Sequence, residues 1–103
     1  MYLGELKGSI KDFMGAVKDY TMAIFYNNNY VDAFIARAAS KVELNDFKDA
    51  IEDCSKAISL RPDYTGSYIN RGLLKYSLKQ DYCSDFKKAC ELGDCVVNNK
   101  FCK

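Results

Sequence analysis

The chain has 103 residues, the usual length of a single domain, so we expect one domain over residues 1–103. Its 15 Lys and Arg against 14 Asp and Glu leave a net charge of +1, and they form no basic stripe, which excludes nucleic acid as the expected partner. No apolar run approaches the roughly 20 residues that span a bilayer, so we expect no membrane insertion.

The first 30 residues predict two helices, over residues 2–10 and 13–27. Leu3, Leu6 and Ile10 are spaced by three and four residues and share one face of the first helix. Asp12 stands where its carboxylate can cap the second helix. The second helix has an apolar stripe made of Ala16, Val17, Tyr20, Ala23 and Ile24.

Residues 31–64 predict a second pair of helices, over 31–44 and 47–60, with a turn at Asn45 and Asp46. Pro62 prevents the second of these helices from continuing. Glu52 and Asp53 are adjacent carboxylates, and they cannot converge on one substrate because neighbouring helical residues do not face each other. We therefore predict that both lie on a solvated helix face.

A third pair of helices is predicted over residues 64–79 and 82–92, and a short helix follows over 95–102. Matching the second helix of this pair to the helix over 47–60 shows that it has lost close to one turn. The match also places Phe86 opposite Cys54, an inward position. Gly72 supplies the small residue of the first helix.

The first two pairs of helices repeat each other at an offset of 34 residues. The recurring positions pair Gly4 with Ala38, Asp12 with Asp46, Phe13 with Phe47, Ala16 with Ala50, Val17 with Ile51, Ala23 with Ala57, Ile24 with Ile58 and Tyr30 with Tyr64. A period of 34 with an early small residue, Asp-aromatic at the turn, two alanines a heptad apart and a terminal Pro resembles the tetratricopeptide repeat (TPR).

The resemblance implies an all-α fold, a right-handed solenoid of three helix-turn-helix repeats over residues 1–30, 31–64 and 65–94 with a capping helix over 95–103. In the TPR family, paired helices approach closely at small residues. We therefore expect burial of Ala16, Ala23, Ala50 and Ala57.

In TPR domains the first helix of each repeat lines a concave groove through six of its positions. The resemblance places in this groove Met1, Tyr2, Glu5, Gly8, Ser9, Asp32, Ile35, Ala36, Ala39, Val42, Glu43, Gly66, Ile69, Asn70, Leu73, Tyr76 and Ser77. TPR domains that hold a peptide's terminal carboxylate use Lys, Arg and Asn at several of these positions, and only Asn70 matches. The remaining groove is largely apolar with acidic residues nearby, which favours an amphipathic helix with some basic residues.

These features predict a non-catalytic protein–protein interaction module that binds a peptide or helix in the groove. The alternative is a disulfide-stapled structural or self-associating repeat module, and in the self-associating form the apolar groove would meet a second copy of the chain in a homodimer. Catalysis is not expected, because the sequence has no His, no Gly-rich phosphate loop and no nucleophile beside a base. Nothing in the sequence implies a cofactor.

Four of the five cysteines lie near the C-terminus, at Cys83, Cys90, Cys95 and Cys102. Residues that face each other across the turn of an antiparallel helical hairpin have numbers with a constant sum, and 83 with 102 gives the same sum as 90 with 95. Of the three possible connectivities, the geometry favours these two pairs. Cysteines seven residues apart on one helix lie about 10.5 Å apart, too far to bridge or to converge on one zinc ion, so no metal site is expected.

The stretch over residues 87–95, KKACELGDC, also resembles the Sel-like and cysteine-rich helical repeats, in which a Cys after Lys-Ala bridges to one just past the turn. The alternative is that the four thiols are reduced and fill the core of a cytoplasmic protein. Bridged cysteines would indicate an exported protein, periplasmic or secreted. The fifth cysteine, Cys54, is expected to be an inert buried thiol.

Overall fold

The computed structural model describes residues 10–102, and every regular element in that part of the chain is an α-helix. The six helices are α2 (Ile10–Tyr26), α3 (Val31–Glu43), α4 (Phe47–Leu60), α5 (Thr65–Ser77), α6 (Cys83–Glu91) and α7 (Val96–Phe101). Apart from Ile10, where α2 begins, the helix predicted over residues 2–10 lies outside the described residues. The bounds of the other predicted helices differ from those observed by three residues at most, at the start of α2.

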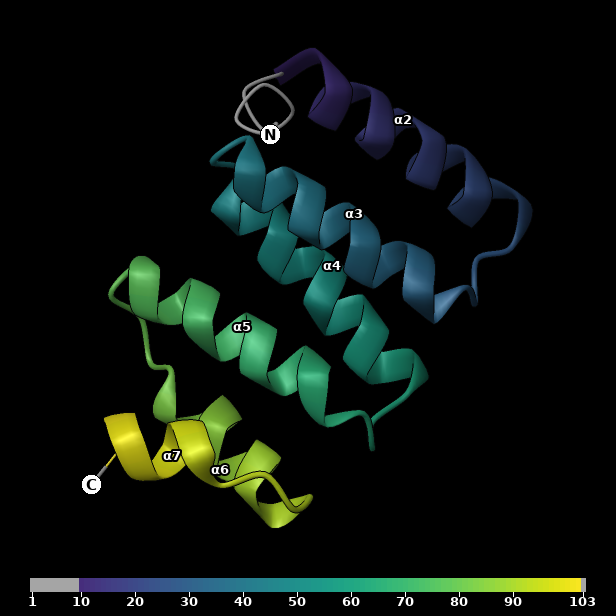
Figure 1. Ribbon diagram of the computed structural model, residues 1–103. Coiled ribbons are helices and arrows are strands. Elements are labelled where there is room, and N and C mark those ends of the chain that lie inside the picture. The colour runs from purple at the N-terminus through teal and green to yellow at the C-terminus, as the bar shows by residue number, and fades with distance from the viewer. Residues whose placement is uncertain (1–9, 103) are drawn as a thin grey trace, which may run out of the picture.

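The helices stack in chain order, each packed against the next. Figure 1 views the face formed by α3, α5 and α7, with α4 and α6 behind them. Because α4 lies behind the space between α3 and α5, the first helices of successive pairs form one side of the stack.

The turns after α3, α5 and α6 share one backbone geometry. Each passes through a residue with a positive φ, namely Asn45 (61°), Lys79 (60°) and Gly93 (119°). In each turn the next residue's N–H donates to the carbonyl five residues before it, at 2.8, 2.8 and 3.0 Å. This bond satisfies a carbonyl at the end of each helix and reverses the chain within a few residues. The predicted turn at Asn45 and Asp46 is therefore confirmed.

The start of α2 differs from the prediction that Asp12 caps a helix. Asp12 lies inside the first turn of α2, which is continuous from Ile10 to Tyr26. Neither Gly nor Pro occurs between Ile10 and Asp12, so nothing in the sequence breaks the helix there. The helix ends just before Asn27, whose Oδ1 accepts a hydrogen bond from the Asn29 N–H at 3.1 Å.

The best-packed part of the core lies between α3, α4 and α5. Ala50 and Ala57 of α4 are both fully buried, as predicted, whereas Ala16 and Ala23 of α2 are only half-buried. The central cluster consists of Ala38, Ala50, Cys54 and Leu74, with Val42, Phe47 and Ile51 packed against it. Small side chains at Ala38 and Ala50 leave room for the larger ones around them.

The third pair of helices packs differently because α6 is short. It has nine residues, against fourteen in α4. Phe86 is fully buried, and it stands where Cys54 stands in the pair before. A Cβ added to Gly72 would lie 2.7 Å from Cδ1 of Phe86, so the Phe86 ring occupies the space that a side chain on α5 would need.

A buried carboxylate joins α2, α3 and α4. Asp53 is 3% exposed, which corrects the prediction that it lies with Glu52 on a solvated face. Arg37 donates to it through Nε at 2.9 Å and through Nη2 at 2.6 Å, and Nζ of Lys41 lies 3.1 Å from its Oδ2. The remaining guanidinium nitrogen, Nη1, donates to the Thr21 hydroxyl at 3.1 Å. These two cations and the bidentate geometry compensate the burial of the carboxylate.

The same arrangement recurs one repeat later, on α4, α5 and α6. Asp85 is 3% exposed and accepts from Nε and Nη2 of Arg71 at 2.9 and 2.7 Å, with Nζ of Lys75 at 3.7 Å. Nη1 of Arg71 donates to the Ser55 hydroxyl at 2.9 Å. The hydrogen bonds with their aspartates raise the pKa of both arginines, so the two guanidinium groups stay charged.

Within the described residues, none of the helices is both long enough and apolar enough to cross a membrane.

Candidate functional site

A groove lies between α3 and α5, with α4 as its floor. It encloses a cavity of about 400 Å³ lined by Ile35, Ala38, Ala39, Val42, Glu43, Phe47, Cys54, Asn70, Leu73, Leu74 and Ser77. The lining residues on α3 and on α5 recur at spacings of three and four, so each helix turns one continuous face toward the groove. Leu73 remains 40% exposed and offers apolar surface to a ligand.

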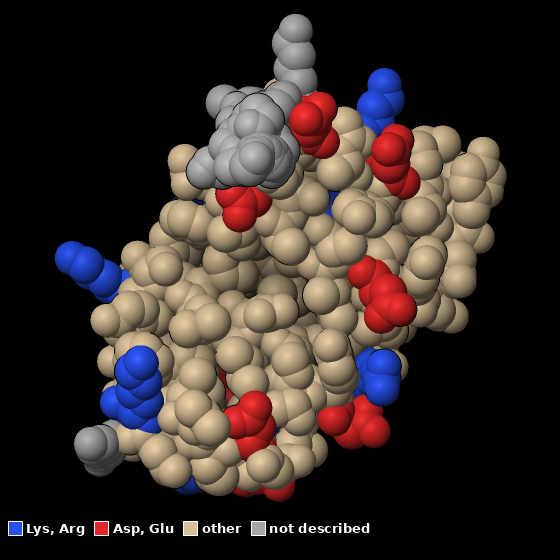
Figure 2. Space-filling view, in the orientation of Figure 1, with Lys and Arg blue, Asp and Glu red and all other residues tan. Residues whose placement is uncertain are grey.

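The groove is nearly free of charge. Glu43 is the charged side chain among its lining residues, and none of those lining residues in the described chain is Lys or Arg. Figure 2 shows the same face as a broad uncharged surface with a hollow near its centre, while the charged side chains stand around its edge. A ligand in the groove would therefore meet mainly apolar surface and one negative charge.

The structure brings together seven of the residues that the TPR resemblance assigned to a groove: Ile35, Ala39, Val42, Glu43, Asn70, Leu73 and Ser77. Five others do not line this cavity: Asp32, Ala36, Gly66, Ile69 and Tyr76. A further five, Met1, Tyr2, Glu5, Gly8 and Ser9, lie outside the described residues.

Sequence reasoning missed the floor of the groove. Ala38 and Leu74 flank the predicted positions on α3 and α5, and Phe47 and Cys54 reach the cavity from α4. Their apolar spacing pointed to the core, and they do form part of it. The signal that could have located them is the small size of Ala38. Its side chain is too short to cover the residues of α4 that form the floor of the groove.

Neither a family model nor a curated protein sequence matches the chain. Solved structures do match it. The TPR domain of Arabidopsis OM64 is 31% identical, with a TM-score of 0.78, and the match covers 87% of this chain and 79% of that one. The chain belongs to the TPR family. The TPR2B domain of yeast Sti1, solved in a complex with pHsp70, is 28% identical with a TM-score of 0.76, over 86% of this chain and 73% of that one.

A third structure, the first TPR of Spaghetti (RPAP3), has a TM-score of 0.78 at 23% identity, over 87% of this chain and 75% of that one. Together these neighbours confirm the predicted TPR-like helical solenoid. The further likeness of residues 87–95 to Sel-like repeats is not confirmed.

Cys54 lies at the floor of the TPR groove and is only 1% exposed. Burial raises the pKa of its thiol to about 11, and the neighbouring charge of Asp53 acts in the same direction. The thiol is therefore protonated at neutral pH and adds to the apolar character of the floor.

A second cavity, of about 550 Å³, adjoins the groove at Ser77 and is lined by Tyr76, Ser77, Lys79, Gln80 and Tyr82. We call this cavity the aromatic end. The rings of Tyr76 and Tyr82 stand nearly perpendicular, with centroids 5.0 Å apart. Since Ser77 lines both cavities, a ligand lying along α5 could reach from one to the other.

Two disulfides fasten the last helix of the TPR stack. Cys83 is joined to Cys102 and Cys90 to Cys95, with Cα–Cα distances of 5.7 and 3.9 Å. These are the two pairs that the spacing favours, and Cys54 is the free cysteine. They tie both ends of α7 to α6.

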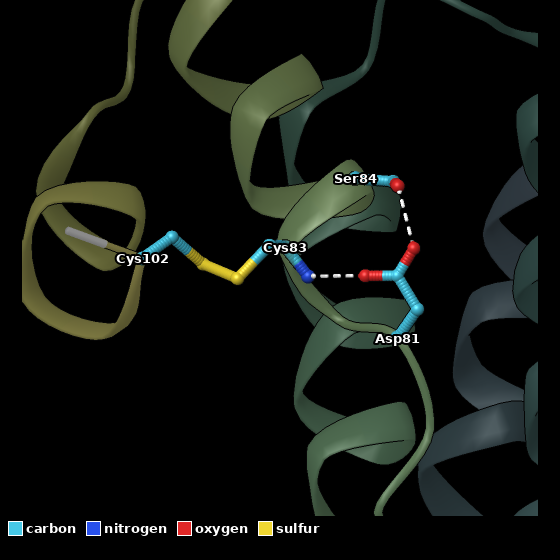
Figure 3. The surroundings of a disulfide bond; sticks show 4 residues. All are labelled: Asp81, Cys83, Ser84 and Cys102. Atoms are coloured by element: carbon cyan, nitrogen blue, oxygen red, sulfur yellow. Dashed lines mark hydrogen bonds between the residues drawn. A yellow bond between two sulfur atoms is a disulfide. The ribbon is translucent and has the colours of Figure 1, made fainter.

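The Cys83–Cys102 disulfide lies beside a capped helix end (Figure 3). Asp81 caps α6, because its Oδ1 accepts from the Cys83 N–H at 3.2 Å and its Oδ2 accepts from the Ser84 hydroxyl at 2.9 Å. The cap fixes the backbone that holds Cys83. The described residues contain no group of three side chains that could hold a metal ion.

Proposed function

We propose that this TPR domain is a non-catalytic interaction module that binds a peptide or short helix in the groove between α3 and α5. The observation that carries the proposal is the continuous apolar lining of the groove, which leaves Leu73 partly exposed. The yeast Sti1 TPR2B domain, 28% identical to this chain, is known in a complex with pHsp70, which supports a peptide ligand here as well.

The chemistry of the groove selects among peptides. Its single charged lining residue, Glu43, favours a basic side chain on the ligand, and its apolar walls favour leucine-like side chains at helical spacing. Between α3 and α5 the described lining holds no cation that would neutralise an acidic peptide, and the nearest one in the site, Lys79, lines the adjoining aromatic end. The ligand that fits is therefore an amphipathic helix with Lys or Arg beside its apolar face.

We propose no catalytic role for the groove. Its ionisable lining residues are Glu43 and the protonated Cys54, which do not form a nucleophile–base pair. The sequence contains no His that could act as a general base at neutral pH.

Two labelled model peptides of about 14 residues test the proposal, both patterned as amphipathic helices, one of Leu and Lys and one of Leu and Glu. We expect the Leu–Lys peptide to bind with at least about tenfold higher affinity in fluorescence anisotropy, because Glu43 attracts its cations and the lining between α3 and α5 offers no cation to the Leu–Glu peptide. Leu73→Asn should weaken this binding, and because Asn is neutral the charge of the groove does not change.

Met22→Asn is the matched control, since Met22 is 47% exposed on α2 and does not line the groove. It should bind the Leu–Lys peptide as the wild type does. Equal affinity for both peptides, or equal losses in the two variants, would contradict groove binding. A dimer that Leu73→Asn disperses on a sizing column would instead favour the self-associating alternative.

We also propose that the domain works in an oxidising compartment, periplasmic or secreted. The support is the pair of disulfides on α6 and α7, because such bonds persist outside reducing compartments. The test is alkylation of the protein in intact cells of the native source, followed by unfolding with the alkylating reagent still present. Only Cys54 should react, and only after unfolding, whereas alkylation of all five cysteines would indicate a cytoplasmic protein.

A further inference from the structure

We propose that the Cys83–Cys102 disulfide regulates the groove by holding the aromatic end in place. The inference rests on the proposed peptide-binding function and adds a control to it. Reduction of this one bond releases the C-terminal part of α7 and removes the support of the aromatic end.

Phe101 connects the disulfide to the groove. It precedes Cys102 in the chain, and its ring centroid lies 5.2 Å from that of Tyr76 and 6.5 Å from that of Tyr82, the two rings that line the aromatic end. It also lies 5.6 Å from the fully buried Phe86. Phe101 therefore supports both tyrosine rings from the side of α7.

The position of α7 depends on its covalent ties. It has six residues, too few to remain helical alone, and none of them is buried. Cys95 fastens the start of α7 to the end of α6, whereas Cys102 fastens the end of α7 beside Phe101. Loss of the Cys83–Cys102 bond thus frees the end that bears Phe101 while the start stays tied.

The Cys83–Cys102 bond is open to a reductant. Both cysteines line a surface cavity of about 410 Å³ together with Asp81, Ser84, Lys87 and Asn98. This cavity is separate from the groove, so a reductant reaches the bond without displacing a bound peptide. Both cysteines are half-buried, and the cavity gives a thiol the access that exchange with a disulfide requires.

A dithiol reductant supplies the two electrons. Its thiolate attacks Sγ of Cys102, the bond between the two protein sulfurs breaks, and Cys83 leaves as a thiolate. Lys87, one turn beyond Cys83 and lining the same cavity, stabilises the leaving thiolate. The second thiol of the reductant then displaces Cys102 and closes the reductant's own disulfide. The two protein sulfurs take up the protons that the reductant's thiols release.

The test compares two paired cysteine variants with the labelled Leu–Lys peptide as the probe. Cys83→Ser with Cys102→Ser removes the disulfide that is proposed to regulate the groove. Cys90→Ser with Cys95→Ser removes the other disulfide and is the matched control. We expect the first pair to weaken peptide binding by about tenfold, the size of one lost aromatic contact. The second pair should change it by about twofold or less, because the short loop is held in place by its own chain.

Hydrogen exchange of residues 96–101 provides a readout that needs no peptide. Exchange should become faster in the Cys83/Cys102 variant and change little in the Cys90/Cys95 variant. Phe101→Ala keeps both disulfides, so it tests the aromatic contact even if a cysteine variant folds poorly, and it should weaken binding as much as the Cys83/Cys102 variant does.

Unchanged binding in the Cys83/Cys102 variant, or an equal loss in both cysteine variants, would overturn the inference. If wild-type protein does not bind the Leu–Lys peptide, the proposed function fails, and the exchange rates alone then decide whether the bond holds α7. Slow exchange in the Cys83/Cys102 variant would show that it does not.

Discussion

The space between α5 and α6 is divided between Gly72 and Phe86. In the repeat before, Cys54 stands in the place of Phe86 and Ala38 in the place of Gly72. The fully buried Phe86 ring is larger than Cys54, and it fills the volume that the side chain of Ala38 has there. A Cβ on Gly72 would come within 2.7 Å of that ring, so the glycine is required by packing. The cost is a lower helix propensity at a buried position in the middle of α5.

Gly72→Ala should lower the free energy of unfolding by about 1–3 kcal/mol, since overpacking against Phe86 outweighs the gain in helix propensity. Urea unfolding measures the difference. Adding Phe86→Leu to Gly72→Ala should restore part of the loss, because the smaller side chain makes room for the methyl group. A stability equal to or above that of the wild type in Gly72→Ala alone would refute the close approach.

Cys54 makes the stability of the domain depend on alkaline pH. Burial raises the pKa of its thiol to about 11, so the unfolded chain loses the proton at a lower pH than the folded one. The contribution of the protonated Cys54 thiol to the free energy of unfolding is complete below the pKa that the thiol has in the unfolded chain. It is lost as the pH rises through the pKa that the thiol has in the folded protein. We expect a loss of about 1–3 kcal/mol between pH 8 and pH 11 that Cys54→Val does not show. Parallel curves for the two proteins would contradict a buried, raised thiol.

At the scale of the helices, two buried aspartates hold consecutive helices in register. Each binds an Arg and a Lys of the preceding helix, and each Arg reaches a hydroxyl one helix further back. The geometry of Asp53 is thus repeated at Asp85, although α6 is shorter than α4. This contact fixes the rotation of each helix more tightly than apolar packing alone.

Asp53→Ala should destabilise the domain by about 3–5 kcal/mol, because Arg37 and Lys41 would lose the charge that compensates their burial. Glu52→Ala is the matched control one residue away, and since Glu52 is exposed it should change stability by less than about 0.5 kcal/mol. Thermal unfolding of both variants decides. Similar small effects in both variants would mean that Asp53 lies on the solvated face of α4 with Glu52.

The contrast between Glu52 and Asp53 shows what a helical pattern can predict. The period of 34 and the apolar spacing located the helices, and the spacing of the cysteines located the two disulfide pairs. They could not separate two adjacent carboxylates, because the burial of Asp53 depends on Arg37 and Lys41 on another helix. A signal was present: Arg37 and Lys41 recur 34 residues later as Arg71 and Lys75, so a repeated charge pair pointed to a repeated contact.

Across the whole molecule, the last two helices depend on covalent bonds as well as on packing. The Cys83–Cys102 bond closes a loop of 19 residues and the Cys90–Cys95 bond one of 5. Replacing Cys83 and Cys102 by Ser should lower the free energy of unfolding by about 2–4 kcal/mol, and replacing Cys90 and Cys95 by less. Urea unfolding gives both differences in free energy when the dependence of the free energy on urea concentration is taken to be the same for all variants. The reverse order would mean that the inner bond, not the outer one, stabilises the end of the stack.

The outer disulfide also determines how the chain would respond to a pulling force. Tension applied at the two ends passes directly from Cys83 to Cys102 and bypasses α6 and α7. The chain between them, roughly 60 Å when extended, cannot lengthen until the bond is broken. The C-terminal part of the domain therefore cannot extend under tension, and the helices before α6 are the ones that unfold.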